Sequence, residues 1–207
     1  SKFIPTTLLL VKNLIKKNLQ AHKNKKGTKY LLKGQKIILD RIEEKHLPEL
    51  LKWRNDPNNR QWYREHRILT IEHQKKWWQE KIINGDGTWY YFVVKPIEEL
   101  ERIIASTGLI YVHPIYKKAE IAFQIGDDRY KTREYELDIL RTLFRYGFND
   151  LGLNRLWIES IIENPIINLY EELGFKKEGV QRQVYYKDGV FKDSVVMSLL
   201  RAEWNND

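Results

Sequence analysis

Three places in the sequence carry side chains that could do acid–base or anion-binding chemistry. Glu120 lies in the alternating segment AEIAF, which places it on a different strand face from the apolar residues beside it. Tyr170 lies among apolar residues in INLYEELGF, and a buried tyrosine hydroxyl needs a hydrogen-bond partner. The polar turn KTREYE (residues 131–136) precedes a long amphipathic segment. The start of a helix attracts anions, so this turn is a candidate anion site.

Each of these features also has a purely structural interpretation. Glu120 could be a surface glutamate paired with Lys117 or Lys118, and Tyr170 could simply pack on its helix. Glutamates in the first turn of a helix interact favourably with its dipole without any ligand. The residue types alone leave both interpretations open.

The composition excludes several kinds of chemistry. The 207 residues include no cysteine, which excludes disulfides, thiolate metal sites and a cysteine nucleophile. The five histidines show no metal-ligand spacing apart from His66 and His73, so we expect no metal site. The absence of cysteine suits a reducing compartment, and we expect a cytoplasmic protein, with an organellar location as the alternative.

The net charge of +8 is concentrated in one segment. Residues 1–36 hold ten lysines and no Asp, Glu or Arg, whereas the rest of the chain is close to neutral. We expect residues 1–35 to form a basic, partly helical extension. This extension either docks on the body or contacts RNA or a ribonucleoprotein. Its apolar run LLLV is too short to span a bilayer, so we expect no membrane span.

The remaining sequence alternates between strand-like and helix-like segments. We expect strands at residues 36–42, 88–96, 106–114, 117–127 and 155–162, then two closing strands around the turn at 187–189. We expect helices at 47–56, 68–84 and 164–175, and a long one that follows the turn at 131–136 and ends at Gly152. This order predicts an α/β domain over residues 36–207 with a mixed, mostly antiparallel sheet flanked by helices.

Four segments in this order resemble the GNAT superfamily of acyl-CoA-dependent N-acyltransferases. They are TGLIYVHPIYKKAEIAFQIGD, FNDLGLNRLWIES, LYEELGFKKEGV and YYKDGVFKDSVVMSLLRAEW. The last two are similar to the branches of ribosomal-protein N-terminal acetyltransferases and spermidine acetyltransferases. The earlier segment LLKWRNDPNNRQWYREHRILTIEHQKKWW is similar to the branch that acetylates amino groups on nucleotide-linked sugars.

The resemblance implies an acetyl-CoA-dependent N-acetyltransferase that acts on a primary amine. The acceptor would be a small molecule or a peptide: a polyamine, an amino sugar or a protein N-terminus. Glu120 would take a proton from the amine, and Tyr170 would protonate the departing sulfur. The cofactor contacts implied by the family are Phe123, Gln124, Ile125, Ile158, Glu159, Lys131, Thr132, Arg133 and Asn164.

Substrate contacts are expected on three segments. Trp53, Arg54 and Asn55 end the first helix and resemble a WRN signature of the sugar-amine branch. Arg67, with His66, lies in the following loop. Two residues of the third predicted strand, Tyr111 and His113, could line the acceptor cleft.

The turn at 131–136 departs from the family pattern, which is rich in glycine so that the pyrophosphate can approach the backbone amides. Alignment places Thr132, Glu134 and Glu136 at the expected glycines. A like-charge contact at about 4 Å would cost on the order of 4 kcal/mol, so we expect weakened acetyl-CoA binding. Two alternatives follow: a non-catalytic domain that contacts RNA through its extension, and an acyltransferase that uses another donor such as an aminoacyl-tRNA.

Overall fold

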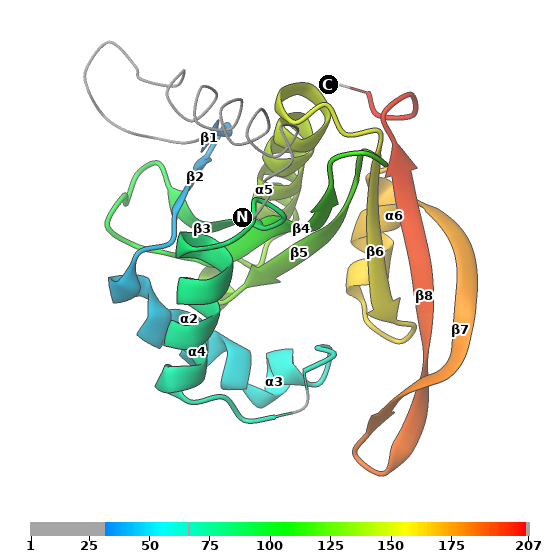
Figure 1. Ribbon diagram of the computed structural model, residues 1–207, viewed down its shortest axis with the longest axis horizontal. Coiled ribbons are helices and arrows are strands. Elements are labelled where there is room, and N and C mark those ends of the chain that lie inside the picture. Colours follow the sequence, from blue (N-terminus) through cyan, green and yellow to red (C-terminus); the bar gives the residue numbers. More distant parts are fainter. Residues whose placement is uncertain (1–31, 66, 206–207) are drawn as a thin grey trace, which may run out of the picture.

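One continuous sheet forms the centre of the protein in the computed structural model, which describes residues 32–65 and 67–205 (Figure 1). Its strands lie in the order β1-β2-β3-β4-β5-β6-β8-β7. Their bounds are β1 (Leu32–Lys33), β2 (Ile37–Arg41), β3 (Tyr90–Pro96), β4 (Ala105–His113), β5 (Lys118–Ile125), β6 (Arg155–Ile161), β7 (Lys176–Lys187) and β8 (Val190–Leu200). Of the predicted basic extension (residues 1–35), residues 1–31, which include the predicted helix, lie outside the described residues, as does His66.

Neighbouring strands run antiparallel except at one place. Only β5 and β6 are parallel, and they flank the long crossover through the helix that follows the turn at 131–136. A parallel pair requires such a crossover, whereas antiparallel strands can be joined by short turns. The predicted mixed, mostly antiparallel sheet flanked by helices is confirmed.

Helices cover both faces of the sheet (Figure 1). They are α2 (Leu47–Asn55), α3 (Pro57–Arg60), α4 (Ile71–Trp77), α5 (Arg133–Arg145) and α6 (Ile166–Glu172). Wider π-helical turns extend α4 through Trp78–Ile83 and α5 through Tyr146–Asp150. The short helix α3 was not predicted, and Asp56 caps it by accepting a hydrogen bond from the Asn58 amide at 2.9 Å.

Two hydrophobic clusters lie on opposite faces of the sheet. The larger one joins the sheet to α5 and α6, and the smaller one joins it to α2 and α4. Strand β3 contributes to both because its side chains alternate: Phe92 and Val94 enter the larger cluster, and Val93 enters the smaller one. The central strands are therefore covered on both faces, which fixes their register, whereas the edge strand β7 is largely exposed.

Two local predictions, the cap of the second predicted helix and the closing hairpin turn, agree with the structure. Thr70 caps α4, accepting a hydrogen bond from the His73 amide at 3.4 Å. The β7–β8 hairpin turns at Asp188 and Gly189, whose φ angles of 50° and 83° match a two-residue type I′ turn. None of the helices within residues 32–65 and 67–205 is long and apolar enough to cross a membrane. Across the same ranges no His, Asp or Glu side chains cluster in a way that could hold a metal ion.

Candidate active site

The site begins where β5 and β6 separate. The two strands pair only through residues 118–120 of β5 and 155–157 of β6, and then diverge (Figure 1). A pocket of about 930 Å³ opens at this divergence, and residues 121–125 and 158–160 form part of its wall. The backbone groups that would have paired across β5 and β6 therefore face this pocket.

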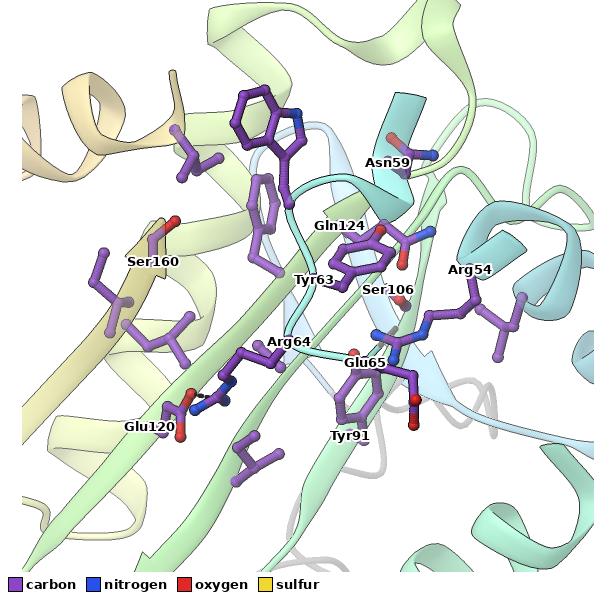
Figure 2. Close-up of a pocket in the computed structure, with 18 of the residues that line it drawn as sticks. Arg54, Asn59, Tyr63, Arg64, Glu65, Tyr91, Ser106, Glu120, Gln124 and Ser160 are labelled. Carbon is purple, nitrogen blue, oxygen red and sulfur yellow. Dashed lines mark hydrogen bonds and ion pairs between the residues drawn. The ribbon is translucent and has the colours of Figure 1, made fainter. Parts of the chain in front are cut away.

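Glu120 is the last residue of the paired stretch and points into the pocket (Figure 2). It is only 3% exposed. Its Oε1 accepts a hydrogen bond from Arg64, whereas its Oε2 has no partner among the residues that the structure describes. Burial raises the pKa of Glu120 above its ordinary value, and the Arg64 guanidinium opposes this shift.

Arg64 lies on the segment between α3 and α4, which crosses the pocket above β5 (Figure 2). Its second guanidinium nitrogen lies 3.8 Å from Glu159 Oε2 on β6. Glu159 Oε1 in turn accepts hydrogen bonds from Tyr185 at 2.6 Å and Ser194 at 2.9 Å. One arginine thus bridges two carboxylates from the two diverging strands.

Tyr170 lines the same pocket from α6 and is 3% exposed. Burial raises its pKa, and the charge of Glu120 raises that pKa further. The hydroxyl is therefore protonated at neutral pH. The structure brings the predicted glutamate and the predicted tyrosine to one cavity.

The turn before α5 leaves its amides available. The structure gives no acceptor, within the described ranges, to the backbone amides of Arg133, Glu134 and Tyr135. Glu134 pairs instead with Lys36, and Glu136 accepts from Arg133 at 3.4 Å. Neither carboxylate caps the helix from within. Each one has a cation beside it, which reduces the charge that a bound anion would meet.

The predicted cofactor contacts divide into two groups. The pocket wall includes Phe123, Gln124, Ile125, Lys131, Arg133 and Asn164. Thr132 is not part of this wall; it forms the N-cap position of α5. The Asn164 side chain is also used locally, because it donates to Ser160 at 3.0 Å and accepts from the Ile166 amide at 3.1 Å. Glu136 and Glu159 also line the pocket.

Two of the three residues in the WRN segment have structural contacts. Trp53 is 4% exposed and packs on Gly126, where an added Cβ would lie 1.8 Å from the indole. The Asn55 side chain donates a hydrogen bond to the Leu69 carbonyl and accepts one from the Leu69 amide, both at 2.9 Å. These two bonds hold the end of the 61–70 segment against α2. Neither side chain reaches the pocket wall.

Arg54, the third residue of that segment, does line the pocket. Its guanidinium lies over the Tyr63 ring, 4.5 Å from the centroid, and points towards Tyr91 and Ser106 (Figure 2). Arg67 also lines the pocket and binds both carboxylate oxygens of Glu65, at 2.9 and 2.7 Å.

The predicted pair on β4 is divided by a β-bulge between Ile110 and His113. Tyr111 has a φ of 52°, which is uncommon for a residue with a side chain, and its ring meets Trp89 at the pocket edge. His113 accepts a hydrogen bond from the Tyr116 amide at 3.1 Å, stacks on the Tyr116 ring and lies outside the pocket wall.

The group that contacts Glu120 most closely, Arg64, was not predicted from the sequence. Arg64 is 56 residues away in the chain and lies in a segment without regular secondary structure. No periodic pattern connects such a segment to a strand, so only its cluster of charged and aromatic residues could have drawn attention to it. Tyr63 was missed for the same reason, whereas Tyr185 lies on the predicted strand β7 and was missed because strand alternation does not indicate its contact with Glu159.

Comparison with known proteins agrees with this geometry. A family model described as an acetyltransferase (GNAT) domain matches residues 36–176. The uncharacterized N-acetyltransferase YoaA of Bacillus subtilis is 28% identical over 104 residues, which is 50% of this chain and 58% of that protein. The spermidine N(1)-acetyltransferase of Vibrio cholerae is 26% identical over 116 residues, 56% of this chain and 65% of that protein. The aligned region thus spans less than two thirds of the length of these two relatives.

A solved structure has the same fold. The crystal structure of spermidine N-acetyltransferase from Vibrio cholerae in complex with CoA and spermine superposes with a TM-score of 0.74 and 22% identity, covering 81% of this chain and 97% of that one. At this identity the likeness concerns the fold alone. Together, the matched family model, the diverging parallel strands and the glutamate at their branch point lead to one conclusion: the chain belongs to the GNAT acetyltransferase family.

Proposed function

We propose that this protein transfers the acetyl group of acetyl-CoA to a primary amine. The observation that carries the proposal is the position of Glu120, which is buried at the branch point of β5 and β6 with Tyr170 in the same pocket. One of its carboxylate oxygens has no partner within residues 32–65 and 67–205. The two alternatives, a non-catalytic RNA-contacting module and an aminoacyl-tRNA-dependent enzyme, receive no support from the family and its named relatives.

The residues present fit acetyl-CoA. The open edges of β5 and β6 offer backbone donors and acceptors to an extended amide-containing chain. The amides at the start of α5 are free to bind phosphate, and Lys131 and Arg133 lie beside them on the pocket wall. The thioester, when bound, supplies the acyl group and a thiol leaving group.

Glu120 is suited to receive the proton that the acceptor ammonium must lose. Arg64 holds Oε1, so the free Oε2 is the atom that accepts the proton. Burial raises the pKa of the carboxylate and so makes it a stronger base than an exposed glutamate, while the Arg64 guanidinium limits that rise. The amine nitrogen, once neutral, can attack the carbonyl carbon as the bond from carbon to sulfur breaks.

Tyr170 is suited to the second proton transfer. Its raised pKa keeps the hydroxyl protonated, and Tyr170 lines the pocket from helix α6. It would donate its own proton to the departing sulfur and regain one from the second proton that the attacking nitrogen loses on becoming an amide, while the proton on Glu120 leaves to solvent. The candidate acceptors remain polyamines, for which the Vibrio relative is named, amino sugars and peptide N-termini.

The proposal is tested by thiol release from acetyl-CoA in the presence of an amine panel that includes all three classes. Glu120→Gln should lower kcat/KM by about a hundredfold or more, because it removes a base and leaves the volume unchanged. Tyr170→Phe should lower kcat by about tenfold or more. Failure of the wild-type protein to release thiol with every amine would overturn the proposal.

A further inference from the structure

A second polar region of the pocket lies away from Glu120. Glu120 and Gln124 are four residues apart on β5 and share its pocket face, so their Cα atoms are separated by about 13 Å along the strand. Ser106 lies directly opposite Gln124 on β4, and its hydroxyl is hydrogen-bonded to that of Tyr91. Arg54 points into this region from α2 (Figure 2).

Gln124 has an unused donor here. It is 8% exposed, and its Nε2 has no hydrogen-bond partner among the residues that the structure describes. A buried amide hydrogen without an acceptor is costly, so such groups are usually satisfied by a ligand or a water. The side chain therefore indicates an acceptor atom, such as an oxygen, on a bound molecule.

The guanidinium of Arg54 is not paired with a carboxylate of any residue that the structure describes. It is half-buried and forms no ion pair with any described residue; its recorded contact is with the Tyr63 ring. The adjacent Glu65 is held by two bonds from Arg67. Lys187 at the tip of β7 donates a hydrogen bond to the Arg60 carbonyl at 3.0 Å; burial, Arg60 and Arg54 lower its pKa, whereas Asp188 and Glu65 raise it. The guanidinium of Arg54 is therefore the charge that an anion bound in this region would meet.

We infer that the Arg54–Gln124 region binds an anionic group on the acceptor, so that the acceptor is an amine carrying a carboxylate or phosphate rather than a polyamine. The inference rests on the proposed acetyl transfer and adds its substrate class. The amine lies at Glu120 and Glu159, where Arg64 shows that the site accepts a cation. The anionic end lies at Arg54, where a second ammonium would be repelled.

The test compares amines that differ only in the group at the opposite end of the carbon chain from the reacting amine. Thiol release is measured with an ω-aminoalkanoate, the ω-aminoalkyl phosphate and the α,ω-diamine of equal chain length, over a series of lengths. We expect one of the two anionic amines to exceed the diamine in kcat/KM by about ten- to a hundredfold, as is usual for one charge-assisted hydrogen-bonded contact. The anionic amine with the higher kcat/KM, the ω-aminoalkanoate or the ω-aminoalkyl phosphate, identifies which anion the region binds.

Two variants isolate the residues concerned. Arg54→Gln should raise KM for the anionic amine about tenfold or more and raise kcat/KM for the diamine, because a repelling charge is removed. Gln124→Met should raise KM for the anionic amine without affecting the packing of Arg54. Arg141→Gln makes the same charge change on the exposed surface of α5 and should alter neither substrate.

Failure of this inference is distinguishable from failure of the proposed function. Transfer to the diamine in preference to both anionic amines, with Arg54→Gln behaving like Arg141→Gln, would overturn the anionic subsite and leave the acetyltransferase in place. Without any acetyl transfer, calorimetric titration with the same ω-aminoalkanoate and ω-aminoalkyl phosphate still decides the matter. Binding lost in Arg54→Gln supports the subsite, and no binding to the wild type refutes it.

Discussion

The two oxygens of Glu120 have different surroundings, and this asymmetry determines how the residue can work. Arg64 binds Oε1, and Oε2 faces the pocket without a partner in the described structure. Two influences on its pKa oppose each other: burial raises it and the guanidinium lowers it. Arg64 is thus a positioning residue, because it orients the carboxylate and limits the rise of its pKa.

The pH profile tests this role of Arg64. Glu120 works in its ionised form, so activity declines as the pH falls through its pKa. Arg64→Gln removes the influence that lowers this pKa, and the acidic limb of kcat/KM should move to higher pH. Arg64→Lys should restore part of the shift, since it returns a positive charge. The measurement is kcat/KM against pH with a single amine.

The surface variant Arg141→Gln serves as the control and should leave the acidic limb in place. An unchanged limb in Arg64→Gln, with the limb still abolished in Glu120→Gln, would contradict the ion pair. A merely structural Arg64 would lower activity equally at all pH values, without moving the limb.

At the scale of the elements, the start of α5 decides how well the cofactor binds. The sequence suggested that Glu134 and Glu136 both oppose a pyrophosphate. The structure separates them, since Glu136 lines the pocket and its side chain is 24% exposed, whereas Glu134 pairs with Lys36 and is 60% exposed. The negative charge facing the site therefore comes mainly from Glu136, and Arg133 offsets part of it.

Coenzyme A affinity should distinguish the two glutamates. Glu136→Gln should lower the Kd for acetyl-CoA about five- to tenfold, because it removes a screened repulsion of about 1 kcal/mol and leaves Arg133 paired with Glu172 alone of its two glutamate partners. Glu134→Gln is the matched control, because it removes the same charge from the first turn of α5 at a position outside the pocket wall. The Kd of this variant for acetyl-CoA should stay within about twofold of the wild type. Isothermal titration calorimetry gives both values. Equal effects of the two substitutions would mean that the anion approaches α5 from another side.

At the scale of the whole molecule, periodic sequence patterns predicted most of the helices and strands. The alternation in AEIAFQI and the turn at Lys187-Asp188-Gly189 each placed an element correctly, because strand faces and two-residue hairpins follow local rules. Helix α3 escaped prediction because it is a single capped turn. The β-bulge at Tyr111 was not predicted, because no glycine or asparagine stands there to indicate a positive φ.

The site was predictable only where a family motif names the residue. Glu120, Tyr170 and Arg54 line one pocket. Trp53 and Asn55, beside Arg54 at the end of α2, have structural contacts instead: Trp53 packs on Gly126, and Asn55 hydrogen-bonds to Leu69. Sequence adjacency cannot separate these roles, because successive residues of a helix point in different directions. The contact of Arg64 with Glu120 depends on the path of an irregular segment, which local patterns do not encode.

The molecule consists of two groups of strands joined across one short parallel contact. Strands β1–β5 form one group and β6, β8 and β7 form the other, and three residue pairs connect β5 to β6 before they diverge (Figure 1). Helices α5 and α6 and the larger hydrophobic cluster hold the groups together on one face. A ligand in the pocket would contact both groups at once.

Binding of acetyl-CoA should therefore stabilise the whole domain rather than one segment. At about 100 times its Kd, a ligand adds about 2.7 kcal/mol to the free energy of unfolding, which corresponds to a rise in Tm of roughly 5–10 °C for a chain of this size. Hydrogen exchange should slow in β5 and in β6 together. Protection confined to the start of α5 would indicate that only the phosphate end is bound and that the diverging strands do not receive the rest of the molecule.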